Sequence, residues 1–447
     1  MATPISTPGV YIEEIRTLPA SVAQVATAIP AFIGYTAEGP TASDLPTIVR
    51  ITSLQDYQAA FGGPESIGFE VTETVAGFTV ALQADPTWLM YPMLQSYFAN
   101  GGGPCYIVSL GDYAATPNLG RYQQGIVALE TEEEPTLLVF PDATSLSSSA
   151  DFYTVQDAAL AHCVKMQDRF ALLDTFTDEP AAISEFRDGT GADGLKYGAA
   201  YFPYLQTTFP YQYDETAVEV TRAGDTPVTV MLDTLEATDN QIYNQIKSEL
   251  DAQRYVLPPS AAMAGIYARV DAEVGVWKAP ANVSVRNVVG PTRKITNAEQ
   301  AGYNVDPTSG KSINAIRAFT GKGTLVWGAR TLAGNDNEWR YVNVRRLFIT
   351  VEESVQKATS FAVFEPNDAN TWVLVRAMIE NYLTDLWKDG ALAGARPDDA
   401  FFVKIGLGES MTAQDILEGR MNVEIGLAAV RPAEFIILKF SHLLQKS

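Results

Sequence analysis

The middle of the chain reads TLLVFPD at residues 136–142, FYTVQDAALAHCVKMQD at 152–168 and RFALLD at 169–174. The first and third stretches are short and apolar, which is typical of buried strands, whereas the second has the length of a helix. A strand, a helix and a second strand in this order predict an α/β region with a largely parallel sheet.

The flanking sequence continues this alternation. Residues 22–35 predict a buried strand, and residues 53–63, SLQDYQAAFGG, predict a short capped helix that ends in glycines. Residues 88–110 predict a helix, a glycine break and a strand, and residues 197–204 predict a further strand. The Thr-, Tyr- and Val-rich stretch 206–235 predicts a hairpin insertion at the surface.

The last quarter of the chain has its own pattern. Residues 339–350, WRYVNVRRLFIT, predict a β-like run that passes into a helix around residues 352–359. An amphipathic helix is predicted after Asn370, because one helical face collects Trp372, Val375, Ile379, Tyr382, Leu383 and Leu386. MNVEIGL at 421–427 and EFIILKF at 434–440 predict two strands.

Length and charge limit the class of protein. A chain of 447 residues is long enough for two to four domains. The formal net charge is −22, which argues against a nucleic-acid partner, because phosphate binding needs clustered Lys and Arg. Residues 1–330 carry 19 Lys+Arg against 37 Asp+Glu, whereas residues 331–447 carry 12 against 16. The nearly balanced C-terminal part is therefore expected to face neighbouring copies, since like charges repel.

Targeting signals are not expected. The N-terminal residues lack the basic and apolar regions of a signal peptide, and no run of about 18 apolar residues predicts a membrane-spanning helix. The two cysteines, Cys105 and Cys163, are too few for a disulfide framework and suit a reducing compartment.

The sequence contains no complete motif for catalysis, phosphate binding or metal binding. SGKS at residues 309–312 suggests a phosphate loop, but the fingerprint needs a glycine where Val305 stands. The histidines are His162 and His442, and neither has a His or Cys partner at zinc-finger spacing. We therefore expect no catalytic residue, no cofactor and no metal site, and the chain is not expected to be an enzyme.

Several stretches together resemble the tail sheath proteins of contractile phages, pyocin-like particles and extracellular contractile injection systems. They are TPGVYIEEI (7–15), AFIGYTAEGP (31–40), VLPPSAAMAGIYARVDAEVGVWKAPAN (256–282), SINAIRAFTGKGTLVWGARTL (312–332), WRYVNVRRLFITVEES (339–354), FEPND (364–368), FFVKIGLGES (401–410) and RPAEFIILKF (431–440). Each is weak alone, but their order and spacing make the match specific outside residues 65–87, 110–150 and 205–235.

The resemblance implies a multidomain α/β and α+β fold, with a conserved inner sheath domain formed by both chain ends and a subtilisin-like α/β outer domain. The expected parts are an N-terminal arm at 1–21, an outer region at 22–335 with its subtilisin-like domain at about 90–335 and a β-rich insertion near 205–235, an inner domain at 336–430, and a C-terminal strand or arm at 431–447.

The resemblance also implies a function. A sheath subunit polymerises with copies of itself around an inner tube protein, meets baseplate and terminator or cap proteins, and contracts by rearranging subunit contacts to drive the tube through a target envelope. It is made in the bacterial cytoplasm and becomes part of a virion tail or a released or anchored particle, without nucleic acid and without insertion into a membrane. The resemblance does not distinguish among a phage tail, a bacteriocin and an injection system as the particle that contains this chain.

Two sets of residues are the candidate interfaces. The inter-subunit arms are expected at Val10, Tyr11 and Ile12 and at Phe435, Ile436, Ile437, Leu438, Lys439 and Phe440, because unpaired strands can pair with a neighbour's sheet. The tube-facing helix is expected to present Arg376, Glu380, Asp385 and Lys388, although it can equally be an ordinary core helix.

Two other classes of protein are alternatives to a sheath. An α/β enzyme would need a nucleophile, a base and an orienting group, and these are not visible in the sequence. A non-sheath extracellular array protein or adhesin fits the acidic, Tyr-rich composition, but the absence of a signal peptide and the RPAEFIILKF pattern at 431–440 argue against it.

Overall fold

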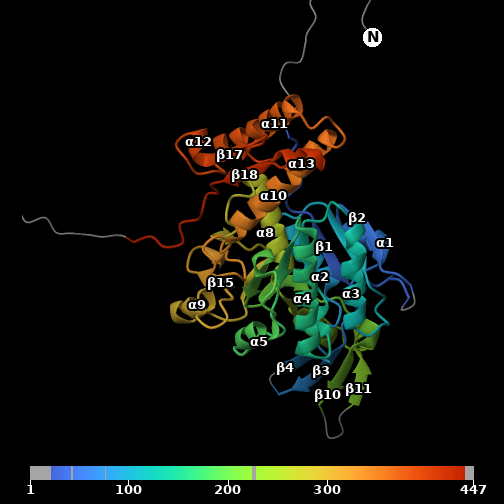
Figure 1. The fold of residues 1–447 in the computed structure, drawn as a ribbon. Helices are drawn as coiled ribbons and strands as arrows, with labels where there is room; N and C mark the ends of the chain where they lie inside the picture. The colour runs from blue at the N-terminus through green and yellow to red at the C-terminus, as the bar shows by residue number, and fades with distance from the viewer. Residues whose placement is uncertain (1–21, 42–43, 76, 224–227, 438–447) are drawn as a thin grey trace, which may run out of the picture. The chain divides into compact units, whose positions relative to one another are not determined.

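The computed structural model describes residues 22–41, 44–75, 77–223 and 228–437 (Figure 1). These residues form two compact units. The larger unit holds residues 26–350 and 431–437, and the smaller unit holds residues 22–25 and 351–430. Helix α10 (Val342–Thr359) contributes its first half to the larger unit and its second half to the smaller one.

A nine-stranded sheet is the centre of the larger unit. Its strands, in spatial order, are β13 (Val283–Ser284), β16 (Gly323–Val326), β15 (Ile313–Phe319), β8 (Gly198–Phe202), β7 (Phe170–Leu173), β6 (Leu137–Val139), β1 (Pro30–Gly34), β5 (Cys105–Ser109) and β2 (Thr47–Ile51). The strands from β15 to β5 run parallel to one another, and antiparallel strands flank them on both sides. The predicted largely parallel sheet is confirmed.

The larger unit has further elements around this sheet. Its α-helices besides α10 are α1 (Leu54–Phe61), α2 (Met90–Ala99), α3 (Leu119–Ala128), α4 (Ser149–Met166), α5 (Ala182–Gly189), α6 (Leu232–Thr238), α7 (Asn240–Leu250), α8 (Ser260–Glu273) and α9 (Asn297–Asn304). Short 3-10 turns lie at Leu129–Thr131, Ala143–Ser145, Leu195–Tyr197 and Glu215–Ala217. Two smaller sheets are β11 (Val228–Met231), β10 (Glu219–Arg222), β3 (Phe69–Thr74) and β4 (Gly77–Leu82), and β12 (Arg254–Leu257), β9 (Leu205–Pro210) and β14 (Val288–Pro291).

Helices cover both faces of the central sheet. The ring of Phe32 in β1 packs edge-on against Tyr97 of α2, with ring centroids 5.2 Å apart. The next residue, Ile33, lies so close to Gly125 of α3 that a methyl group there would come within 3.0 Å of it. Because successive side chains of a strand point to opposite faces, α2 and its neighbour α8 lie on one face, and α3 and its neighbour α4 lie on the other.

The smaller unit combines helices with a two-stranded sheet. It contains the second half of α10, a 3-10 turn at Ser360–Ala362, α11 (Ala369–Lys388), α12 (Pro397–Ala400), β17 (Phe401–Lys404), α13 (Ala413–Leu417) and β18 (Glu424–Leu427). Asp368 caps α11 by accepting hydrogen bonds from the amides of Asn370 and Thr371. Thr412 and Asp415 form a capping box at the start of α13.

The prediction of a β-like run at residues 339–350 is wrong, because α10 begins at Val342. Alternating apolar and polar residues indicate a strand when the polar ones face water. Here the polar ones are buried as well: Asn343 donates to the main-chain oxygen of Trp277 at 2.9 Å, and Arg346 pairs with Asp271 at 2.5 Å. A helix that is buried on most sides leaves no period in the sequence that distinguishes it from a strand.

The hairpin predicted within residues 206–235 is present as β10 and β11. It is not a separate decoration, because β10 also pairs in parallel with β3. Two hairpins that lie about 150 residues apart in the chain therefore share one four-stranded sheet.

A buried carboxylate, Asp174, follows β7 and fixes the start of α8. It accepts hydrogen bonds from the amide of Ser260 at 3.0 Å and from its hydroxyl at 2.5 Å. Burial raises the pKa of Asp174 to about 7, although the two hydrogen bonds lower it. The folded chain therefore holds a proton that the unfolded chain releases between about pH 4 and pH 7, so this group makes the fold less stable as the pH rises through that range.

Asp174→Asn is expected to remove this pH dependence and to stabilise the fold at pH 8 by up to about 4 kcal/mol. The amide oxygen of the variant can accept the Ser260 N–H while its NH₂ group donates to the Ser260 hydroxyl. Urea unfolding at pH 5 and pH 8 measures the effect, with Asp193→Asn on the exposed surface as the matched control. A stability difference between the two pH values that is the same in Asp174→Asn and wild type would contradict it.

Candidate assembly interface

The C-terminal segment, residues 431–437, exposes three consecutive large apolar side chains. Phe435, Ile436 and Ile437 are 72%, 78% and 80% exposed. The strand predicted at 434–440 is not formed in its described part, where no strand of the described chain pairs with it. The other expected arm residues, Val10, Tyr11, Ile12, Leu438, Lys439 and Phe440, lie outside the described residues. The segment thus leaves apolar surface and unpaired main-chain groups accessible to another chain.

The sheet of the smaller unit has room for additional strands. Among the described residues, β17 and β18 pair only with each other, from Phe401 opposite Leu427 to Lys404 opposite Glu424. Both outer edges therefore carry main-chain donors and acceptors without a ladder partner. Two strands alone are marginally stable, and a third or fourth strand would stabilise them.

Helix α11 carries the four residues expected to face a tube. The predicted apolar stripe of the helix is buried at Val375, Ile379, Tyr382, Leu383 and Leu386, whereas Trp372 is only partly buried. Met378, which was not part of the predicted stripe, is buried as well. Asp385 and Lys388 are exposed and pair with each other at 3.0 Å. Arg376 instead donates to Glu409 and to the main-chain oxygen of Ile405, each at 2.5 Å, and Glu380 is half-buried. Asp385 and Lys388 thus lie together on the surface, whereas the guanidinium of Arg376 is bound to residues of its own unit.

An exposed apolar run at residues 361–364 was not anticipated from the sequence. Phe361 and Val363 are exposed, and Phe364 is fully exposed with a φ of +69°. A bulky residue in the left-handed region costs about 1–3 kcal/mol, so the backbone is strained at Phe364. Apolar residues predict burial, and for that reason no sequence signal distinguished this run from core residues.

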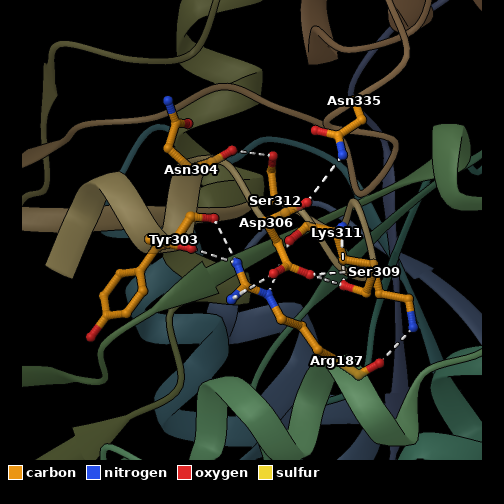
Figure 2. A network of polar contacts seen from close by, with 9 residues as sticks. Arg187, Tyr303, Asn304, Asp306, Ser309, Lys311, Ser312 and Asn335 are labelled. Atoms are coloured by element: carbon orange, nitrogen blue, oxygen red, sulfur yellow. Dashed lines mark hydrogen bonds and ion pairs between the residues drawn. The ribbon is translucent and has the colours of Figure 1, made fainter.

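The Ser309–Ser312 loop is a structural element (Figure 2). Lys311 is buried, and its ammonium group donates to the main-chain oxygens of Arg187, at 2.6 Å, and Thr190. Ser309 donates to Asp306 through its amide at 2.6 Å and its hydroxyl at 2.5 Å, which lowers the pKa of that carboxyl group. The lysine that would meet a phosphate is therefore bound to main-chain oxygens, and the interpretation as an ordinary loop fits the geometry.

The histidine expected to have no catalytic role lies in α4 beside a buried arginine. The Nε2 atom of His162 is 2.8 Å from a guanidinium nitrogen of Arg169. Burial and the charge of Arg169 lower the pKa of His162 to about 4, so the ring is neutral at pH 7. Its neighbour Cys163 is buried, which raises the pKa of the thiol. In the part of the chain that the structure describes, no three His, Cys, Asp or Glu side chains gather as metal ligands would, and none of the helices has the length and apolarity needed to cross a membrane.

Comparisons with known proteins identify the family. A model of the phage tail sheath protein central domain matches residues 119–332, and a model of the phage tail sheath C-terminal domain matches residues 334–441. The contracted sheath of an extracellular contractile injection system, PVC, is 35% identical, with 98% of both chains covered and a TM-score of 0.68. This chain belongs to the contractile tail sheath family. The contracted helical sheath of the anti-feeding prophage (AFP) is 33% identical over 98% of this chain and 99% of that chain, with a TM-score of 0.65.

Phage relatives of this sheath protein match over shorter stretches. The tail sheath protein of Enterobacteria phage T4 is 27% identical over 150 residues, which are 34% of this chain and 22% of that protein. A putative prophage major tail sheath protein of Pseudomonas aeruginosa (strain UCBPP-PA14) is 26% identical over 186 residues, 40% of this chain and 44% of that protein. The alignments thus span less than half of these relatives. The expected family is confirmed, and the sheath protein is a structural subunit, not an enzyme.

Proposed function

We propose that this sheath protein polymerises as a helix around an inner tube and contracts, by exchanging one set of subunit contacts for a more favourable one, to drive the tube through a target envelope. The observation that carries the proposal is the match over 98% of the chain to sheaths solved in the contracted state. Baseplate and terminator or cap proteins would hold the two ends of the polymer. A related chain occurs in the AFP baseplate structure, at 34% identity, which supports the baseplate contact.

The proposed link between subunits is strand addition. An arm that contains Phe435–Ile437 would pair with an open edge of the β17–β18 sheet in a neighbour, and an arm around Val10–Ile12 would pair likewise. If an arm forms about four to six ladder bonds at about 1 kcal/mol each, a link contributes several kcal/mol per subunit. Such links would keep subunits attached while they slide from an extended to a contracted lattice.

The domain assignment within this function is also a proposal. Residues 336–430 would form the inner sheath domain, and residues 22–335 the outer region with its insertion near 205–235. A subtilisin-like fold for about residues 90–335 is supported by the parallel sheet with helices on both faces. The particle would be a virion tail or a released or anchored contractile machine, assembled in the bacterial cytoplasm.

Charge reversal on α11 tests the tube contact. The double variant Asp385→Lys/Lys388→Glu keeps the exposed pair but swaps its charges, so folding is expected to be unchanged. Each exposed contact is worth at most about 1 kcal/mol, so co-assembly with tube protein is expected to weaken about fivefold to tenfold per subunit. Sedimentation of tube with sheath measures this, and Arg396→Glu/Asp399→Lys, which swaps an exposed pair at the start of α12, is the control. Unchanged co-sedimentation would rule out α11 as the tube-facing element.

Negative-stain microscopy of the purified protein, with and without its tube protein, tests the function as a whole. Hollow striated cylinders are expected. Discrete subunits under all conditions would count against a sheath, and flat two-dimensional arrays would favour the alternative of an extracellular array protein.

A further inference from the structure

Glu434 ties the C-terminal segment to the larger unit immediately before the exposed residues begin. Its carboxylate accepts two hydrogen bonds from the guanidinium of Arg330, at 3.0 and 2.6 Å, in the parallel geometry that makes such pairs strong. It also accepts from the side-chain amide of Asn304 at 2.8 Å and from the hydroxyl of Tyr341 at 3.3 Å. We call these four residues the Glu434 anchor.

The partner side of the Glu434 anchor is fixed independently of Glu434. The side chain of Asn314 fixes the main chain of Arg330. It accepts a hydrogen bond from the Arg330 amide and donates one to the Arg330 main-chain oxygen, both at 2.8 Å. The guanidinium also donates to the main-chain oxygen of Asn304 at 3.1 Å. Figure 2 shows that the same Asn304 oxygen faces Ser312, while the side-chain amide of Asn304 points away from the loop. The Ser309–Ser312 loop thus supports the donors that meet Glu434.

Arg330 needs a carboxylate at this position. Its side chain is 5% exposed, and that of Glu434 is 22% exposed. A buried guanidinium without a counter-charge is strongly destabilising, so an arginine held in this orientation implies that an anion belongs there. Burial by itself would raise the pKa of Glu434, but the hydrogen bonds from Arg330 and Asn304 and the charge of Arg330 outweigh it and lower the pKa. Glu434 is therefore ionised at neutral pH.

The exposed apolar residues begin directly after this contact. A groove of about 650 Å³ lies between the C-terminal segment and the surface that contains Trp327 and Gln300. Phe435 and Ile436 stand at the edge of this groove and remain largely exposed, so the groove does not take them up. The described part of the segment is thus held at Glu434, whereas the side chains of Phe435, Ile436 and Ile437 remain largely exposed.

We propose that the Glu434 anchor is the positioning contact that sets where the C-terminal arm leaves its subunit and how far the arm reaches. Residues 431–434 stay on the arm's own subunit, and the residues after Glu434 pair with the neighbour. Release of the anchor would lengthen the free part by residues 431–434, which span about 13–14 Å when extended. This inference rests on the proposed strand addition between subunits, because it assigns the contact that positions the donated arm.

Cleavage of the unassembled subunit by chymotrypsin after Phe435 tests the anchor. A protease must bind several extended residues on both sides of the bond, and an anchored Glu434 obstructs this. Glu434→Gln and Glu434→Ala are expected to speed this cleavage about tenfold, whereas Glu338→Gln, an equal charge change on the exposed surface, is expected to leave it unchanged. Cleavage after the exposed Phe364 serves as the internal reference in each digest. Equal rates at Phe435 in wild type and in both Glu434 variants would overturn the anchor.

Assembly separates a positioning role from a merely structural one. The protein concentration at which half of the subunits sediment as polymer is expected to rise at least fivefold in Glu434→Gln and to stay unchanged in Glu338→Gln. Because Arg330 loses its counter-charge in Glu434→Gln, the urea midpoint of this variant is expected to fall. Assembly is therefore compared without urea, where circular dichroism shows that the variant is folded. Faster cleavage with normal assembly would overturn the positioning role. A wild-type protein that never assembles would instead contradict the proposed sheath function, while the cleavage comparison still decides the anchor.

Discussion

Removal of residues 435–447 is expected to abolish assembly of the sheath and to leave the subunit folded. Phe435, Ile436 and Ile437 are exposed, so their loss takes little from the fold of their own subunit. The deletion keeps Glu434 and with it the pair to Arg330. Loss of about four to six ladder bonds at about 1 kcal/mol each weakens a subunit contact by a factor of about 10³–10⁴. Sedimentation and negative-stain microscopy measure the assembly, and urea unfolding measures the fold.

A matched substitution distinguishes loss of the arm from loss of chain length. Phe435→Asp/Ile437→Asp keeps the length of the chain but places charges where apolar side chains would be covered by a neighbour. It is expected to block assembly as the deletion does. Polymers of normal length from either variant would exclude the C-terminal segment as the inter-subunit link, and a lowered urea midpoint would show instead that the segment stabilises its own subunit.

Asp271→Ala is expected to give the largest loss of stability, about 3–5 kcal/mol, because it leaves a buried guanidinium without its partner. Asp271 on α8 accepts two hydrogen bonds from Arg346 on α10, at 3.0 and 2.5 Å, and a third from the hydroxyl of Thr27 at 2.6 Å. Arg346 and Asp271 are 3% and 6% exposed, and the guanidinium also lies 4.7 Å from the ring centre of Tyr267. Urea unfolding of the variant measures the loss.

An exposed pair in the same unit is the control for this prediction. Glu130 pairs with Lys165 at 2.6 Å, with side chains 31% and 62% exposed. Glu130→Ala is expected to lower the stability much less than Asp271→Ala does, because water screens the exposed pair and replaces its hydrogen bonds. Similar losses for Asp271→Ala and Glu130→Ala would mean that burial does not strengthen the Arg346 pair.

Local patterns in the sequence predicted the elements that are held together by local physics. Elements β6, α4 and β7 form at the predicted stretches 136–142, 152–168 and 169–174. A short apolar run and a segment of helix length can be recognised from neighbouring residues alone. The end of α1 follows from the glycines after it, because Gly62 has a φ of +81°, which glycine adopts easily. The buried stripe of α11 follows from its period.

Features that depend on distant partners were not predictable in the same way. The stretch 339–350 resembles a strand in sequence but forms part of a helix. Its polar residues Asn343 and Arg346 are buried against Trp277 and Asp271, which lie about 70 residues away in the chain. The parallel pairing of β10 with β3 and the exposure of Phe364 likewise have no local signature. The order and spacing of the weak motifs nevertheless indicate the sheath family. These motifs are spread over the whole chain, so their combination does not depend on any single tertiary contact.

The sequence by itself determined the apolar run at residues 435–437 and the family of this protein, because these depend on which residues are present and in what order. The tertiary structure alone decided where the chain is held just before this run. The sequence places Glu434 next to Phe435, but the site that receives its carboxylate comes from Asn304, Arg330 and Tyr341, which lie 93 to 130 residues earlier. Only folding brings those donors together around one carboxylate, and so only the structure separates the anchored part of the segment from the part that is free to reach a neighbour.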